Sequence, residues 1–129
     1  EAMLDSLYED YPLVYITGPD PRDIALTVSQ MNTHKIRGSS TVLIAEESAA
    51  LRAAATKPPA DNPDYRHVYI ALPRTNDTLM VAFTATVVIQ RLALRMSVMK
   101  AQYLDRLGFV GHGVHPDVPK NVSKSITVD

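Results

Sequence analysis

The apolar positions in the first half of the chain gather in three short runs separated by polar and turn-forming residues. These runs are residues 13–17, 41–45 and 67–72, and each is rich in β-branched side chains. Runs of this length that end at glycine, proline or polar residues are typical of buried β-strands. The sequence therefore predicts three strands.

The segment between the first two runs carries helix signals. Asp20 is placed to cap exposed amide groups, and Pro21 suits the first helical position. Apolar residues recur at positions 24, 28 and 31, which lie on one face of a helix. We expect this helix to pack through that face and to end at Gly38.

A second helix is predicted in the alanine-rich residues 46–56, which stop at Pro58. Residues 57–65 contain three prolines and two aspartates and are expected to form an exposed loop. Strands that alternate with helices at this spacing imply right-handed crossovers and a parallel sheet. The predicted fold class is therefore α/β, a three-layer α-β-α sandwich with helices on both faces of the sheet.

A long helix is predicted from Asp77 to about Tyr103, with apolar residues on nearly every face. A membrane span is disfavoured because Arg91 and Arg95 lie inside the apolar stretch, where each charge costs roughly 2.5 to 3.5 kcal/mol. The sequence instead indicates a buried helix that packs on the sheet and also on a neighbouring subdomain or subunit.

The net charge and the absence of cysteine exclude several classes of function. The 129 residues fit one domain, and a net charge of −1 without a basic cluster argues against nucleic acid as a partner. The absence of cysteine excludes a disulfide framework and a thiolate nucleophile, and it suits a reducing, cytoplasmic compartment. No secretory signal is visible at the amino terminus. His112, His115 and Asp117 lack a fourth ligand, so no metal site and no cofactor are predicted.

The last eleven residues carry the most specific signal in the chain. They resemble the carboxyl end of the isomerising glutamine–fructose-6-phosphate aminotransferases, which typically finish Pro-Arg-Asn-Leu-Ala-Lys-Ser-Val-Thr-Val-Glu. The identical positions are Pro119, Asn121, Lys124, Ser125, Thr127 and Val128. Residues 87–93 and 115–119 are also similar to the family, and before Asp77 the resemblance is one of architecture.

The resemblance implies that residues 1–107 form part of the second sugar-isomerase (SIS) subdomain, with 108–129 as a tail over the active site. It also implies a role in making glucosamine 6-phosphate from fructose 6-phosphate and glutamine. The family's glutaminase domain, first SIS subdomain and catalytic glutamate have no counterpart in this sequence. Partners implied by the resemblance are these remaining portions, the sugar phosphates and a second subunit, with no membrane, and the chain alone is expected to be inactive.

The resemblance assigns the catalytic role to Lys124, because the family's lysine at this place is implicated in ring opening and in a Schiff base with the ketose. An amine with a lowered pKa attacks a carbonyl readily. Ser123 and Ser125 flank it and are predicted to bind the sugar or its phosphate. Two alternatives stay open: another SIS-family phosphosugar isomerase or deglycase, and a non-catalytic SIS module that senses sugar phosphates.

Overall fold

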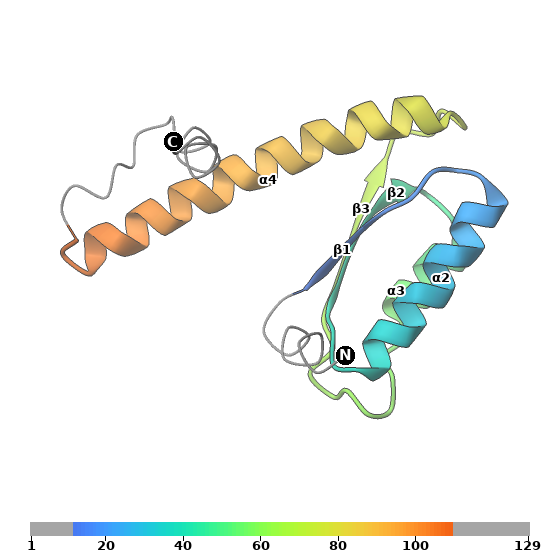
Figure 1. Ribbon diagram of the computed structural model, residues 1–129, viewed down its shortest axis with the longest axis horizontal. Coiled ribbons are helices and arrows are strands. Elements are labelled where there is room, and N and C mark those ends of the chain that lie inside the picture. Colours follow the sequence, from blue (N-terminus) through green and yellow to red (C-terminus); the bar gives the residue numbers. More distant parts are fainter. Residues whose placement is uncertain (1–11, 110–129) are drawn as a thin grey trace, which may run out of the picture. The chain divides into compact units, whose positions relative to one another are not determined.

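A computed structural model describes residues 12–109 of the chain. Three strands and three helices alternate along it (Figure 1). In chain order they are β1 (Leu13–Ile16), α2 (Pro21–Ile36), β2 (Thr41–Glu46), α3 (Ala49–Thr56), β3 (His67–Leu72) and α4 (Thr78–Arg106). The predicted α/β class is confirmed.

The three strands form one parallel sheet in the order β1-β2-β3. Because side chains alternate between the two faces of a strand, residues in register share a face across the sheet. Two such rows lie on the same face, Val14–Val42–Val68 and Ile16–Ile44–Ile70. This face is therefore built from β-branched aliphatic side chains on all three strands.

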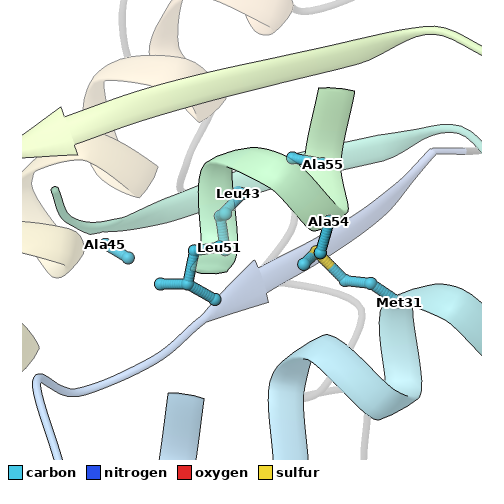
Figure 2. Close-up of a cluster of buried hydrophobic side chains, with 6 residues drawn as sticks. All are labelled: Met31, Leu43, Ala45, Leu51, Ala54 and Ala55. Atoms are coloured by element: carbon cyan, nitrogen blue, oxygen red, sulfur yellow. The ribbon is translucent and has the colours of Figure 1, made fainter. Parts of the chain in front are cut away.

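The other face of the sheet carries the core. Leu43 and Ala45 of β2 pack against Met31 of α2 and Leu51 of α3, and all four side chains are buried (Figure 2). The remaining members of the buried cluster are Ala54 and Ala55. Both helices lie on this side of the sheet (Figure 1), so two layers of the predicted sandwich are present.

Both ends of α2 follow the sequence prediction. Asp20 accepts a hydrogen bond from the Arg22 amide at 2.8 Å and so caps the first turn. At the other end, Gly38 has a φ of 96°, and its amide donates to Lys35 O at 3.1 Å. The Ser39 amide donates to His34 O at 3.2 Å, which completes a Schellman motif. Glycine is needed here because other residues are strained at this φ.

The predicted start of the second helix at Glu46 is wrong. Glu46 is the last residue of β2, in register with Leu72 of β3, and α3 begins at Ala49. The strand runs one residue longer because its backbone continues to pair with β3. The carboxylate of Glu46 is then held by the loop that follows β3, as described below.

The long helix is present, and within the described residues most of its large apolar side chains are exposed. Its predicted packing on a neighbouring subdomain or subunit stays a prediction. Val81 and Ala85 are buried, whereas Phe83 is 62% exposed and Met96 is 61% exposed. The 29 residues of α4 span roughly 43 Å, about twice the 20 Å of a six-residue strand, so a sheet of this size cannot cover the helix. By length and composition alone, α4 would suffice to cross a membrane.

The chain divides into two compact units within α4. The first ends at Ala85 and holds the sheet, and the second begins at Thr86.

Candidate functional site

The residues selected from the sequence, Lys124, Ser123 and Ser125, lie outside residues 12–109. Their assignment to catalysis and sugar binding therefore stays a prediction. The described residues contain two other polar sites, one at the carboxyl edge of the sheet and one around a buried lysine.

A cleft of about 190 Å³ lies where the three parallel strands end. The end of β2 and the segments that follow the three strands form its walls, through Gly18, Pro19, Glu46, Ser48, Arg74 and Asn76. In open α/β sheets, ligands bind outside the carboxyl ends of the strands. The cleft is smaller than the roughly 300–1,000 Å³ of a pocket that encloses a whole ligand, so it suits one polar group.

Glu46 organises this cleft from the end of the central strand. Its Oε1 accepts hydrogen bonds from the Thr75 amide at 2.7 Å, from Thr75 Oγ1 at 2.6 Å and from the Asn76 amide at 3.0 Å. The Asn76 amide also lies 3.1 Å from Oε2. One buried carboxylate thus fixes the backbone of the loop between β3 and α4.

This clamp sets the conformation of the loop. Asn76 has a φ of 55°, a left-handed conformation that asparagine tolerates better than most residues. Its Oδ1 accepts a hydrogen bond from Arg74 Nε at 3.4 Å. Glu46 therefore holds the loop, and Asn76 of this loop holds the side chain of Arg74 at the wall of the cleft.

The electrostatics of the cleft favour binding over proton transfer. The hydrogen bond from the Thr75 hydroxyl lowers the pKa of Glu46, with further lowering by the Thr75 and Asn76 amides and by Arg74, while burial opposes them. A carboxylate that is ionised and already accepts several hydrogen bonds is a poor general base near neutral pH. We therefore regard Glu46 as a structural clamp and Arg74 as the cation that a ligand would meet.

Gly18 and the residue that precedes α3, Ser48, also line the cleft. A Cβ atom at Gly18 would lie 3.0 Å from Thr78 Oγ1, so glycine allows the first turn of α4 to approach closely. The Ser48 amide donates to Tyr69 Oη at 3.2 Å, and Tyr69 Oη donates to Glu46 O at 2.7 Å. The tyrosine thus ties the start of α3 to the end of β2, and burial raises its pKa.

The second polar site is centred on Lys35 of α2, whose residue surface is only 3% exposed. Its ammonium donates to Ala54 O and, at 2.8 Å, to Lys57 O, and it lies 5.3 Å from the centre of the Tyr65 ring. Burial, and secondarily the charge of Lys57, lowers the pKa of Lys35. An amine of this kind suits carbonyl chemistry, but here it is bonded to the last carbonyls of α3 and serves as that helix's carboxyl-terminal cap.

Neither Glu46 nor Lys35 was identified from the sequence. Their partners lie 29 to 30 and 19 to 22 residues away, respectively, so no local spacing reveals them. For Glu46 the available signal was its position, because polar residues at the carboxyl ends of parallel strands converge at one edge of the sheet. No such signal exists for Lys35, which lies within α2.

Comparison with known proteins adds no identification. A scan against protein-family models finds no match, and searches of curated proteins and of solved structures find no similar protein.

Proposed function

We propose that this chain forms the carboxyl-terminal part of the isomerase half of an enzyme that makes glucosamine 6-phosphate from fructose 6-phosphate and glutamine. The observation that carries the proposal is the match of residues 119–129 to the end of that enzyme family, including Lys124. Further support comes from the order of elements, since the family's second SIS subdomain also has successive parallel strands followed by a long apolar helix.

In this proposal the amine of Lys124 attacks the carbonyl of the open-chain ketose, and Ser123 and Ser125 bind the sugar or its phosphate. The catalytic base and the phosphate loop belong to other portions of the parent enzyme, which works in the cytoplasm as an oligomer and needs no cofactor. The hydrogen bonds that Glu46 already accepts and its lowered pKa agree with this division, because both make its carboxylate a poor general base.

Borohydride trapping in the full-length protein tests the assignment. Fructose 6-phosphate is added, the Schiff base is reduced, and the labelled lysine is located by peptide mass analysis. Wild-type protein should carry the sugar on Lys124, and Lys124→Arg should carry none because a guanidinium does not form the imine. Lys57→Arg is the matched control, since it exchanges an exposed lysine of the same chain and should label normally.

Unchanged labelling in Lys124→Arg would remove this lysine from the mechanism. The nitrogen source separates the remaining alternatives. The proposed enzyme forms glucosamine 6-phosphate only when glutamine is present, whereas a phosphosugar isomerase converts the sugar without it. A sensing module would bind the sugar phosphate without turnover.

A further inference from the structure

A groove of about 440 Å³ lies between α2 and α3, next to the capping lysine Lys35. The two helices lie side by side on the covered face of the sheet (Figure 1). Along the groove, α2 presents Val28, Asn32 and Ile36, which are spaced four residues apart and therefore share one side of the helix. The volume falls within the roughly 300–1,000 Å³ of sites that hold a whole small molecule.

The groove exists because α3 carries small side chains on this side. Ala50, Ala53 and Ala54 line it, and a methyl group fills little of the space between two helices. Pro58 extends the same wall just beyond the end of α3. The walls are therefore mainly apolar, and Ile36 of α2 remains 60% exposed beside them.

Two lysines, Lys35 and Lys57, supply the charge of the groove. Both line it, and within residues 12–109 neither forms an ion pair. The Lys35 ammonium uses two of its three N–H donors on Ala54 O and Lys57 O. Burial, and then the charge of Lys57, lowers the pKa of Lys35, so the two ammonium groups repel each other. An anion bound beside both would relieve this repulsion.

The charges around the groove sum to a positive value. No acidic residue is among the described residues that line it. Helix α2 ends at Ile36 and α3 ends at Thr56, so two helix carboxyl ends lie here, each with roughly −0.5 charge. The two ammonium charges exceed these two half charges by about one unit. A single negative charge is therefore favoured, and a cation is disfavoured.

We infer that the groove binds a small apolar monocarboxylate, with its hydrocarbon body along the alanines of α3 and its carboxylate against Lys35 and Lys57. The apolar body matches the walls, and one carboxylate matches the surplus of positive charge. A sugar phosphate fits poorly, because its hydroxyl groups would lose hydrogen bonds to water against alanine and proline. The inference uses residues 28–59 of the first unit and does not rest on the proposed sugar chemistry.

Titration of the 129-residue chain with sodium octanoate, followed by ¹H–¹⁵N NMR, tests the inference. Octanoate should bind with a dissociation constant on the order of 1 mM or tighter. The shifts should concentrate at the amides of residues 28–36 and 50–57, which flank the groove. Octylammonium carries the same hydrocarbon chain with the opposite charge and should bind at least about tenfold more weakly.

Two variants separate the charge of the groove from its shape. Lys57→Met removes one cation and should weaken octanoate binding roughly two- to fivefold. Arg22→Met on α2 changes the net charge equally, outside the groove, and should leave binding unchanged. Ala53→Leu places a larger side chain in the groove and should weaken binding by more than about tenfold. Ala53 is exposed on α3, so this leucine leaves the core intact, and far-UV circular dichroism checks the fold of each variant.

Three results would overturn the inference. Equal binding of octanoate and octylammonium would show that contact depends on the hydrocarbon chain alone. The absence of octanoate shifts along the groove at millimolar concentration, or unchanged binding in Ala53→Leu, would show that the groove is not the site. Displacement of octanoate by an equal concentration of inorganic phosphate would show that the lysines select a charge without an apolar body.

Discussion

The packing of α3 on the sheet predicts a large difference between two leucine-to-alanine substitutions. Leu51 of α3 is 1% exposed and belongs to the buried cluster with Met31 and Leu43, whereas Leu26 of α2 is 55% exposed. Both leucines lie inside helices, so the change in helix propensity is nearly the same at both sites. The comparison therefore isolates the effect of side-chain burial on the free energy of unfolding.

The magnitude follows from what each side chain loses. Leu51→Ala removes three buried carbons, at about 0.8 kcal/mol each for transfer from water. The cavity left between α3 and β2 adds to this, which gives a loss of roughly 3–4 kcal/mol, within the range of 2.7–5.0 kcal/mol seen for buried leucines. Leu26→Ala removes carbons that already contact water and should change stability by less than about 0.5 kcal/mol.

Urea unfolding followed by far-UV circular dichroism measures both values. The slope of the unfolding free energy against urea should stay constant, so the loss at Leu51 should appear as a lower midpoint. If Leu51→Ala and Leu26→Ala differ by less than about 1 kcal/mol, the cluster drawn in Figure 2 does not hold the domain together, and the described packing is refuted.

Two further predictions concern the buried polar groups. Lys35→Met should lower the free energy of unfolding by about 1–3 kcal/mol, because it leaves Ala54 O and Lys57 O without this donor. Lys57→Met removes an exposed amine and should lower the free energy of unfolding by less than about 0.5 kcal/mol. Equal losses in the two variants would contradict the capping role of Lys35. Because folding lowers the pKa of Glu46, its carboxylate binds a proton more tightly in the unfolded chain than in the folded one. The stability that the ionised carboxylate contributes is therefore present above the ordinary pKa of 4.5 and is lost as pH falls through the folded-state pKa. The urea midpoint of the wild type should fall with acidification in this window and that of Glu46→Gln should fall less; identical pH profiles would show that the carboxylate does not act as a clamp.

Local sequence signals were sufficient for most of the fold. The three strands were predictable because β-branched runs end at proline, glycine or polar residues, and α2 was predictable because Asp20, Pro21 and Gly38 mark its two ends. These signals depend on interactions within a few residues. The start of α3 was missed for the opposite reason: whether Glu46 extends β2 is decided by pairing with β3, which is distant in the sequence.

The candidate site was less predictable, since it depends on contacts across the fold. Neither the clamp from Glu46 to Thr75 nor the bonds from Lys35 to the end of α3 follow from any motif. Conversely, the residues that the sequence selected, Lys124 with Ser123 and Ser125, depend on a resemblance and lie outside the described residues. Their role remains a prediction for the trapping experiment.

The apolar pattern of α4 predicts burial, yet within the described residues most of its large apolar side chains are exposed. Apolar residues on nearly every side of a helix do indicate burial, but the pattern does not say which molecule covers them. The described sheet offers only three short strands, and the helix exceeds their length about twofold. Within the described residues, Met96 and Met99 of α4 stay exposed, so the pattern identifies an apolar surface without identifying what covers it.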